Sequence, residues 1–147
     1  MYRALIALTA CAAVGATGTT LALDNGHDKG KVKVKVLSAS DITEKLDGKK
    51  AKVTTVEVTL EPGQSSPPHR HPGPVFGYVL EGEYEWAIND NPAKVLKAGD
   101  TFYEPTGCLH RISKSAAKEG KTRVLAVVLH PHDAKELVIP DKPRTKE

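Results

Sequence analysis

The stretch GQSSPPHRHPGPVFGYVLEG, residues 63–82, contains two histidines separated by one residue. Side chains of a β-strand repeat every second residue, so His69 and His71 are expected to project from one face and to lie close enough to share a cation. This is a metal-ligand spacing. A second stretch, GDTFYEPTGCLH at residues 99–110, ends in His110 after a Pro-x-Gly turn. It predicts a third imidazole, supplied by a neighbouring strand.

Together the two stretches resemble the two sequence motifs of the cupin superfamily. The first motif places glycine, His-x-His, an acidic residue and glycine at fixed intervals, and the second places glycine, Pro-x-Gly, histidine and asparagine. The matching residues are Gly63, His69, His71 and Gly82 for the first motif, and Gly99, Pro105, Gly107 and His110 for the second. Two positions depart from the pattern: Val75 replaces the acidic metal ligand, and Lys114 replaces the terminal asparagine.

Short segments of alternating polarity, separated by turn residues, predict an all-β fold. Residues 51–60 are rich in β-branched side chains, and residues 83–88 alternate between charged and apolar or aromatic side chains. Asp47-Gly48 is a turn signal between two such segments. No amphipathic helical pattern interrupts them, and the even spacing is typical of an antiparallel sandwich or barrel. This agrees with the double-stranded β-helix, or jelly roll, that the cupin resemblance implies.

Four segments are expected along the chain. Residues 1–22 form a signal peptide, residues 23–50 an N-terminal arm with an edge strand, residues 51–132 the cupin β-barrel, and residues 133–147 a C-terminal tail that packs weakly or not at all. Within the arm, the lysine–valine alternation of residues 31–37 predicts a half-buried strand with its lysines in water. Such lysines also protect a sheet edge from unwanted pairing.

Residues 1–22 predict export, to the periplasm or outside the cell. Arg3 is their only charge, and the apolar run behind it ends in a small-x-small cleavage site at Ala22. A membrane anchor and a lipoprotein processed at Cys11 are the alternatives. Cleavage would leave Cys108 as the single cysteine, so no internal disulfide can form and stability must come from the core. We expect no membrane attachment of the cleaved protein.

The composition suits one globular domain, with 147 residues, 39% of them hydrophobic and 27% charged. Nucleic acid is excluded as a partner, because the lysines are dispersed and no basic stripe carries interleaved aromatic residues. The expected partner is a small-molecule ligand or substrate. A homodimer is also expected, because small cupins commonly pair and residues 31–37 offer a free strand for a partner's sheet edge.

Three neutral imidazoles suit a divalent transition metal such as Fe, Zn, Mn, Ni or Cu, and the sequence does not choose among them. With redox-active iron, the site resembles the three-histidine dioxygenases of the cupin superfamily, which implies oxygen-dependent cleavage of an enolisable or dicarbonyl substrate. With zinc, a polarised carbonyl or an activated water would favour isomerisation or hydrolysis. The hypothesis from another class is a non-catalytic module that binds or senses a small ligand.

Catalysis would also need acid or base groups, and Glu104 and Tyr103 are the nearest candidates in the sequence. If Phe102 faces inward, so does Glu104, which could then be a metal ligand, a group beside the ligands or a surface residue. Among the remaining candidates, His130 and His132 are interpreted as residues of the barrel rim. Cys108 is interpreted as a small buried hydrophobe.

Overall fold

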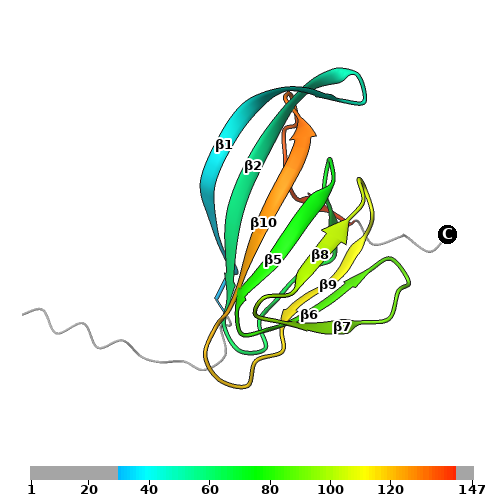
Figure 1. The fold of residues 1–147 in the computed structure, drawn as a ribbon. Helices are drawn as coiled ribbons and strands as arrows, with labels where there is room; N and C mark the ends of the chain where they lie inside the picture. The colour runs from blue at the N-terminus through cyan, green and yellow to red at the C-terminus, as the bar shows by residue number, and fades with distance from the viewer. Residues whose placement is uncertain (1–29, 142–147) are drawn as a thin grey trace, which may run out of the picture.

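The computed structural model describes residues 30–141, so the signal peptide predicted for residues 1–22 lies outside the described part of the chain. The described part is an all-β jelly roll in which two antiparallel sheets face one another (Figure 1). The strands are β1 (Lys33–Leu46), β2 (Lys49–Leu60), β3 (Ser65–Ser66), β4 (His69–Arg70), β5 (Val75–Glu81), β6 (Glu83–Ile88), β7 (Lys94–Lys97), β8 (Thr101–Glu104), β9 (His110–Ser115), β10 (Thr122–Pro131) and β11 (Ile139–Pro140).

The two sheets divide the sequence motifs between them. One sheet has the strand order β1-β2-β10-β5-β8, and the other has the order β11-β4-β9-β6-β7, with β3 paired to β9. The first motif therefore passes along β3 and β4 of the second sheet and continues on β5 of the first. The second motif likewise runs from β8 to β9. This crossing between sheets brings both motifs to the space that the sheets enclose.

Strand β5 alternates between buried and exposed residues. Val75, Gly77 and Val79 are buried, whereas the residues between them are exposed. Gly77 is required by packing, because a Cβ there would lie 2.0 Å from the Phe102 ring on the paired strand β8. The short side chain thus allows an aromatic residue to enter the interior from β8.

The hydrophobic core fills the space between the sheets. Leu60, Val79, Tyr84 and Val124 are buried together, and Phe102 packs against them. Tyr84, Val124 and Phe102 also line a cavity beside this core. Core and cavity are therefore continuous, and large side chains of the core form part of the cavity wall.

Strand β1 is an edge strand, as predicted, but its burial is not as predicted. It continues beyond the strand predicted at residues 31–37 as far as Leu46, and pairs with β2 along its length, with two register shifts. The Asp47-Gly48 turn joins the two strands, with positive φ at both residues. However, Val34 is 60% exposed and Val36 is 59% exposed, so the expected half-buried strand is wrong. The reason is visible in Figure 1, where β1 lies at the far edge of its sheet, away from the second sheet.

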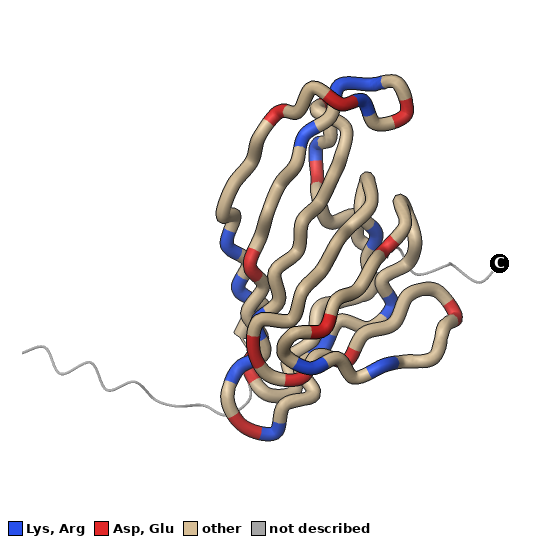
Figure 2. The backbone as a smooth tube through the Cα atoms, viewed as in Figure 1, with Lys and Arg blue, Asp and Glu red and all other residues tan. Residues whose placement is uncertain are grey.

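Charged residues of both signs are scattered over the described chain (Figure 2). They gather at the β1–β2 hairpin and in the loops at the opposite end of the molecule, whereas the middle of β2, β10 and β5 is mostly uncharged. In this view, the lysines and arginines of residues 30–141 do not form a continuous stripe. Within the same residues, no helix is long and apolar enough to cross a membrane.

Candidate metal centre

His69 and His71, the two histidines of the first motif, lie against each other. Their ring centroids are 4.9 Å apart and their planes are nearly perpendicular. The Nδ1 atom of His69 contacts the Pro67 carbonyl at 2.8 Å, and that of His71 contacts the Leu137 carbonyl at 2.6 Å. A carbonyl oxygen only accepts, so each Nδ1 must carry the proton. The Nε2 atom of each imidazole is therefore left with a lone pair.

His110 enters from β9, where it pairs directly with His69. Its Nε2 lies 3.3 Å from the Tyr84 hydroxyl, which donates its own proton to Ser113 Oγ at 2.8 Å. Nε2 must therefore be the donor to the tyrosine oxygen, which leaves Nδ1 as the lone-pair atom. This Nδ1 is buried and has no hydrogen-bond partner. A buried polar atom without a partner is costly, so a ligand is expected at this position.

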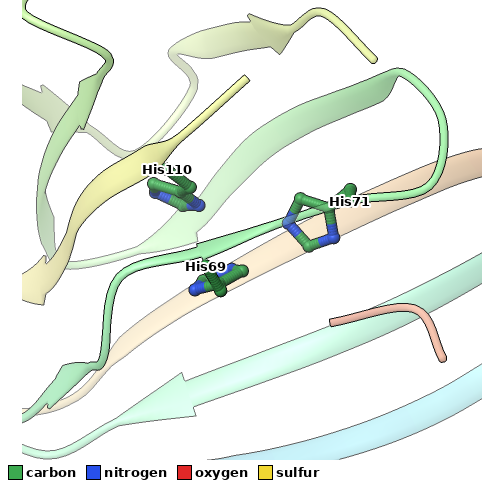
Figure 3. A group of neighbouring side chains, drawn as sticks. All are labelled: His69, His71 and His110. Atoms are coloured by element: carbon green, nitrogen blue, oxygen red, sulfur yellow. The ribbon is translucent and has the colours of Figure 1, made fainter. Parts of the chain in front are cut away.

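The three imidazoles converge on one point (Figure 3). One potential ligand nitrogen from each lies within 4.8 Å of the others. Burial lowers the pKa of all three imidazoles, and it lowers that of His110 to about 3, with help from the two neighbouring histidines. Neutral imidazoles are the form that binds metal. The cluster therefore has the number, spacing and protonation state of a transition-metal site.

Glu104 lies beside this cluster and is only 1% exposed. One oxygen, Oε1, accepts a hydrogen bond from Trp86 Nε1 at 3.0 Å and lies 3.1 Å from His110 Nδ1. The other, Oε2, lies 3.5 Å from His71 Nε2 and has no hydrogen-bond partner. Burial raises the pKa of Glu104 to about 7, although the bond from Trp86 opposes the rise.

The lone-pair nitrogens of His71 and His110 and the carboxylate oxygens of Glu104 repel one another unless a positive charge lies between them. The lone pairs of His71 Nε2 and His110 Nδ1 face the carboxylate of Glu104, so acceptors meet acceptors. A proton on Glu104 relieves one such contact, and a divalent cation relieves all of them. The donor set of imidazole nitrogens and one carboxylate fits a divalent transition ion.

Comparison with known proteins gives the family. The family model described as "Cupin domain" matches residues 56–128, which include both histidine motifs. The chain is a cupin. No curated protein matched the sequence.

Solved structures share the cupin fold at low sequence identity. A double-stranded β-helix protein from Klebsiella pneumoniae is 21% identical, with a TM-score of 0.58 over 79% of this chain and 90% of that one. A cupin superfamily protein from Desulfitobacterium hafniense is 17% identical, with a TM-score of 0.55 over 71% of this chain and 83% of that one. These likenesses establish the fold alone, so the chemistry must be argued from the site.

The carboxylate beside the histidines, Glu104, does not come from the acidic position of the first motif. Val75 occupies the acidic motif position and is buried, but it cannot bind a metal. In the sheet, Val75 of β5 is paired directly with Glu104 of β8. A carboxylate is thus present on the neighbouring strand at the same level. Lys114, the other departure, forms an ion pair with Glu85 at 3.4 Å and does not line the cavity.

The C-terminal tail, predicted to pack weakly or not at all, forms part of the site. Ile139 of β11 pairs with Arg70 of β4, and Asp141 lies 3.3 Å from the Arg70 guanidinium. The tail also supplies the Leu137 carbonyl that contacts His71. The prediction is therefore wrong for residues 137–141, because their backbone completes the edge of the second sheet. The polar composition of residues 133–147 does not indicate this pairing.

Two further placements need correction. Tyr103 is 51% exposed and stacks on Phe76 on the outer face of the sheet, so it lies outside the pocket in which a catalytic group was expected. The alternation of β8 turns Phe102 and Glu104 inward instead. His130, expected at the rim, is buried and lies 2.9 Å from the Thr54 hydroxyl. His132 is half-exposed beside Asp41, and Cys108 is buried as predicted.

Proposed function

We propose that this cupin binds one divalent transition metal through His69, His71 and His110, with Glu104 as a fourth, acidic ligand. We further propose that it acts on a small substrate that reaches the centre with two oxygen atoms, such as the enolate of a dicarbonyl compound or of an α-hydroxy ketone. With iron, the resulting reaction is oxygen-dependent cleavage of the substrate.

One observation carries the metal proposal. Glu104 Oε2 and His110 Nδ1 are buried and lack hydrogen-bond partners, and Oε2 lies 3.5 Å from the lone-pair nitrogen of His71. Buried polar atoms are nearly always paired in native proteins, so two such atoms in one cluster point to a bound cation. The sequence departure at Val75 supports the same conclusion, because the paired strand returns a carboxylate to the site.

The charge of the ligand set selects the substrate head group. Three neutral imidazoles and one ionised carboxylate contribute one negative charge, so a divalent ion would leave one positive charge uncompensated. A substrate that chelates as a monoanion would neutralise it. A bound divalent ion supplies Lewis acidity, and iron supplies in addition the redox chemistry that dioxygen requires.

The rest of the cavity supports oxygen-dependent chemistry over hydrolysis. Among the described residues that line the cavity, Glu104 is the only carboxylate, and no lysine or arginine is present. If Glu104 is bound to metal, no second acid or base remains to activate water or to move protons between carbons. A shortage of acid and base groups is also expected of a non-catalytic cupin that only binds a ligand. An assay of turnover distinguishes the two functions.

Metal content tests the first part of the proposal. Elemental analysis of the purified protein should find about one transition ion per chain, and alanine at His69, His71 or His110 should remove most of it. His132→Ala is the matched control, because His132 is a half-exposed histidine that contacts Asp41 outside the cluster. Unchanged metal content in all three cluster variants would end the proposal.

Oxygen uptake tests the second part. Iron-loaded protein should consume oxygen when simple β-dicarbonyl and α-hydroxy ketone compounds are supplied, and zinc-loaded protein should not. If both forms bind these compounds, seen as a shift of the metal-dependent spectrum or as heat, but neither consumes oxygen, the non-catalytic alternative replaces the dioxygenase proposal.

A further inference from the structure

The metal cluster occupies one end of a larger cavity whose other walls are apolar. The cavity has a volume of about 360 Å³, within the range of small-molecule sites. Its walls come from both sheets and from residues 137–140 of the tail. At about 30 Å³ for each water-sized group, the space holds about twelve non-hydrogen atoms. A ligand that fills this space would therefore extend well beyond a two-oxygen head group.

Polar groups able to bind such an extension are scarce among the described residues. Tyr84 and Ser113 line the cavity, but their hydroxyls bond to each other. The Nδ1 atoms of His69 and His71 contact backbone carbonyls. Outside the metal cluster, the described lining residues leave two side-chain groups to bond to a ligand: the hydroxyl of Ser66 and the proton of the Ser113 hydroxyl. A sugar or other polyol would lose its bonds to water without replacement, at roughly tenfold in affinity for each hydroxyl.

Two valine-rich rows cross the first sheet from the interior to its open edge. Adjacent strands place these residues directly opposite one another on the same face. The rows are Val124–Val58–Val34 and Ala126–Val56–Val36, each running from β10 through β2 to β1. All six residues line the cavity.

Exposure rises along the rows. Val124 is 2% exposed and Val56 is 8% exposed, whereas Val34 on the edge strand is 60% exposed. The apolar surface thus continues from the buried interior to the outside without a polar interruption. An elongated apolar group that lies on these rows would cover the valines of β1, whose exposure on an edge strand is otherwise unfavourable.

We propose that the natural ligand is amphipathic, with a chelating monoanionic head at the metal and an elongated apolar tail along the two valine rows toward β1. The proposal rests on the metal site proposed above and specifies its substrate class. The single uncompensated charge selects the head, and the apolar walls select the tail. The apolar walls disfavour sugars, and the single uncompensated charge disfavours dianionic dicarboxylates.

Straight-chain hydroxamates test this inference without turnover. Acetohydroxamate and its homologues up to ten carbons have one chelating head and differ only in tail length. Titrated into metal-loaded protein, they should bind about fourfold more tightly for each added methylene. The gain should level off near nine carbons, when the cavity is full.

Variants of the edge strand locate the tail. Val34→Thr with Val36→Thr keeps the shape and strand preference of both side chains but makes the rows polar. The variant should lose several-fold in affinity for the long hydroxamates and keep wild-type affinity for acetohydroxamate. Val95→Thr is the control, because Val95 is an exposed valine of β7 that does not line the cavity.

Three results would overturn the inference. Equal affinity for all chain lengths would refute the proposed apolar tail without affecting the proposed metal site. If the double variant changes the molecular mass in light scattering and not the dependence on chain length, the valines are covered by a second copy of the chain instead. Failure of the protein to take up any metal would refute the proposed function itself, and this inference with it.

Discussion

Replacing Glu104 with glutamine should stabilise the metal-free protein and weaken metal binding. Glutamine keeps the acceptor for Trp86 and the shape of the side chain while removing its charge. Burial raises the pKa of Glu104 from 4.5 to about 7, so the folded state disfavours the carboxylate. The sign follows from this: the favourable contribution is complete below pH 4.5, and it is lost as the pH rises through about 7.

The size of the effect follows from the same values. The difference between 4.5 and about 7 corresponds to about 3 kcal/mol, at about 1.4 kcal/mol for each pH unit. Glutamine does not ionise, so Glu104→Gln avoids this loss. In metal-free protein, the free energy of unfolding of the variant relative to wild type should increase by about 3 kcal/mol between pH 4.5 and pH 8.

Urea unfolding after treatment with a chelator measures this difference, and Glu119→Gln, at an exposed position, is the control. With metal present, the order should reverse, because the variant lacks the acidic ligand and is stabilised less by the ion. If the difference in unfolding free energy between Glu104→Gln and wild type stays constant from pH 4.5 to pH 8, burial does not disfavour the ionised form of Glu104 in metal-free protein, and the reasoning is refuted. Wild-type metal affinity in the variant would remove Glu104 from the ligand set.

Two further predictions concern groups that orient the histidines. Ending the chain after Glu136 removes the carbonyl that contacts His71, so calorimetric metal affinity should fall about 10–100-fold, whereas ending it after Asp141 should leave affinity near that of the full chain. Equal affinities of the two shortened chains would show that the tail does not orient the site. Tyr84→Phe leaves the Nε2–H of His110 without its acceptor, so we expect about a tenfold loss of metal affinity and about 1–2 kcal/mol of stability by urea unfolding. Retention of wild-type affinity would contradict the tautomer assigned to His110.

Local sequence was sufficient for the fold class and for the three histidines. The strand at residues 83–88 and the turns at Asp47-Gly48 and Pro105-x-Gly107 depend on neighbouring residues, so they can be predicted directly from the chain. His69 and His71 share a face because of their spacing. The order of the two motifs predicted that His110 would join them, and the structure places one ligand atom of each within 4.8 Å of the others.

The position of Glu104 was left open by the sequence, because Phe102 and Tyr103 are both apolar enough to face a core. The structure decided it through two long-range contacts: the absence of a side chain at Gly77 admits the Phe102 ring, and the pairing of Val75 with Glu104 sets the level of the carboxylate. Neither contact leaves a periodic signal in the local sequence.

Long-range pairing also explains the other differences between prediction and structure. The tail was judged by its polar composition, yet its backbone completes an open sheet edge beside Arg70, and backbone hydrogen bonds do not depend on side-chain polarity. For Val34, alternation correctly gave the face of the strand but not its exposure, because exposure depends on what lies opposite. Sequence periodicity thus determined the directions of the side chains, and only the packing of the two sheets decided which of them enclose the site.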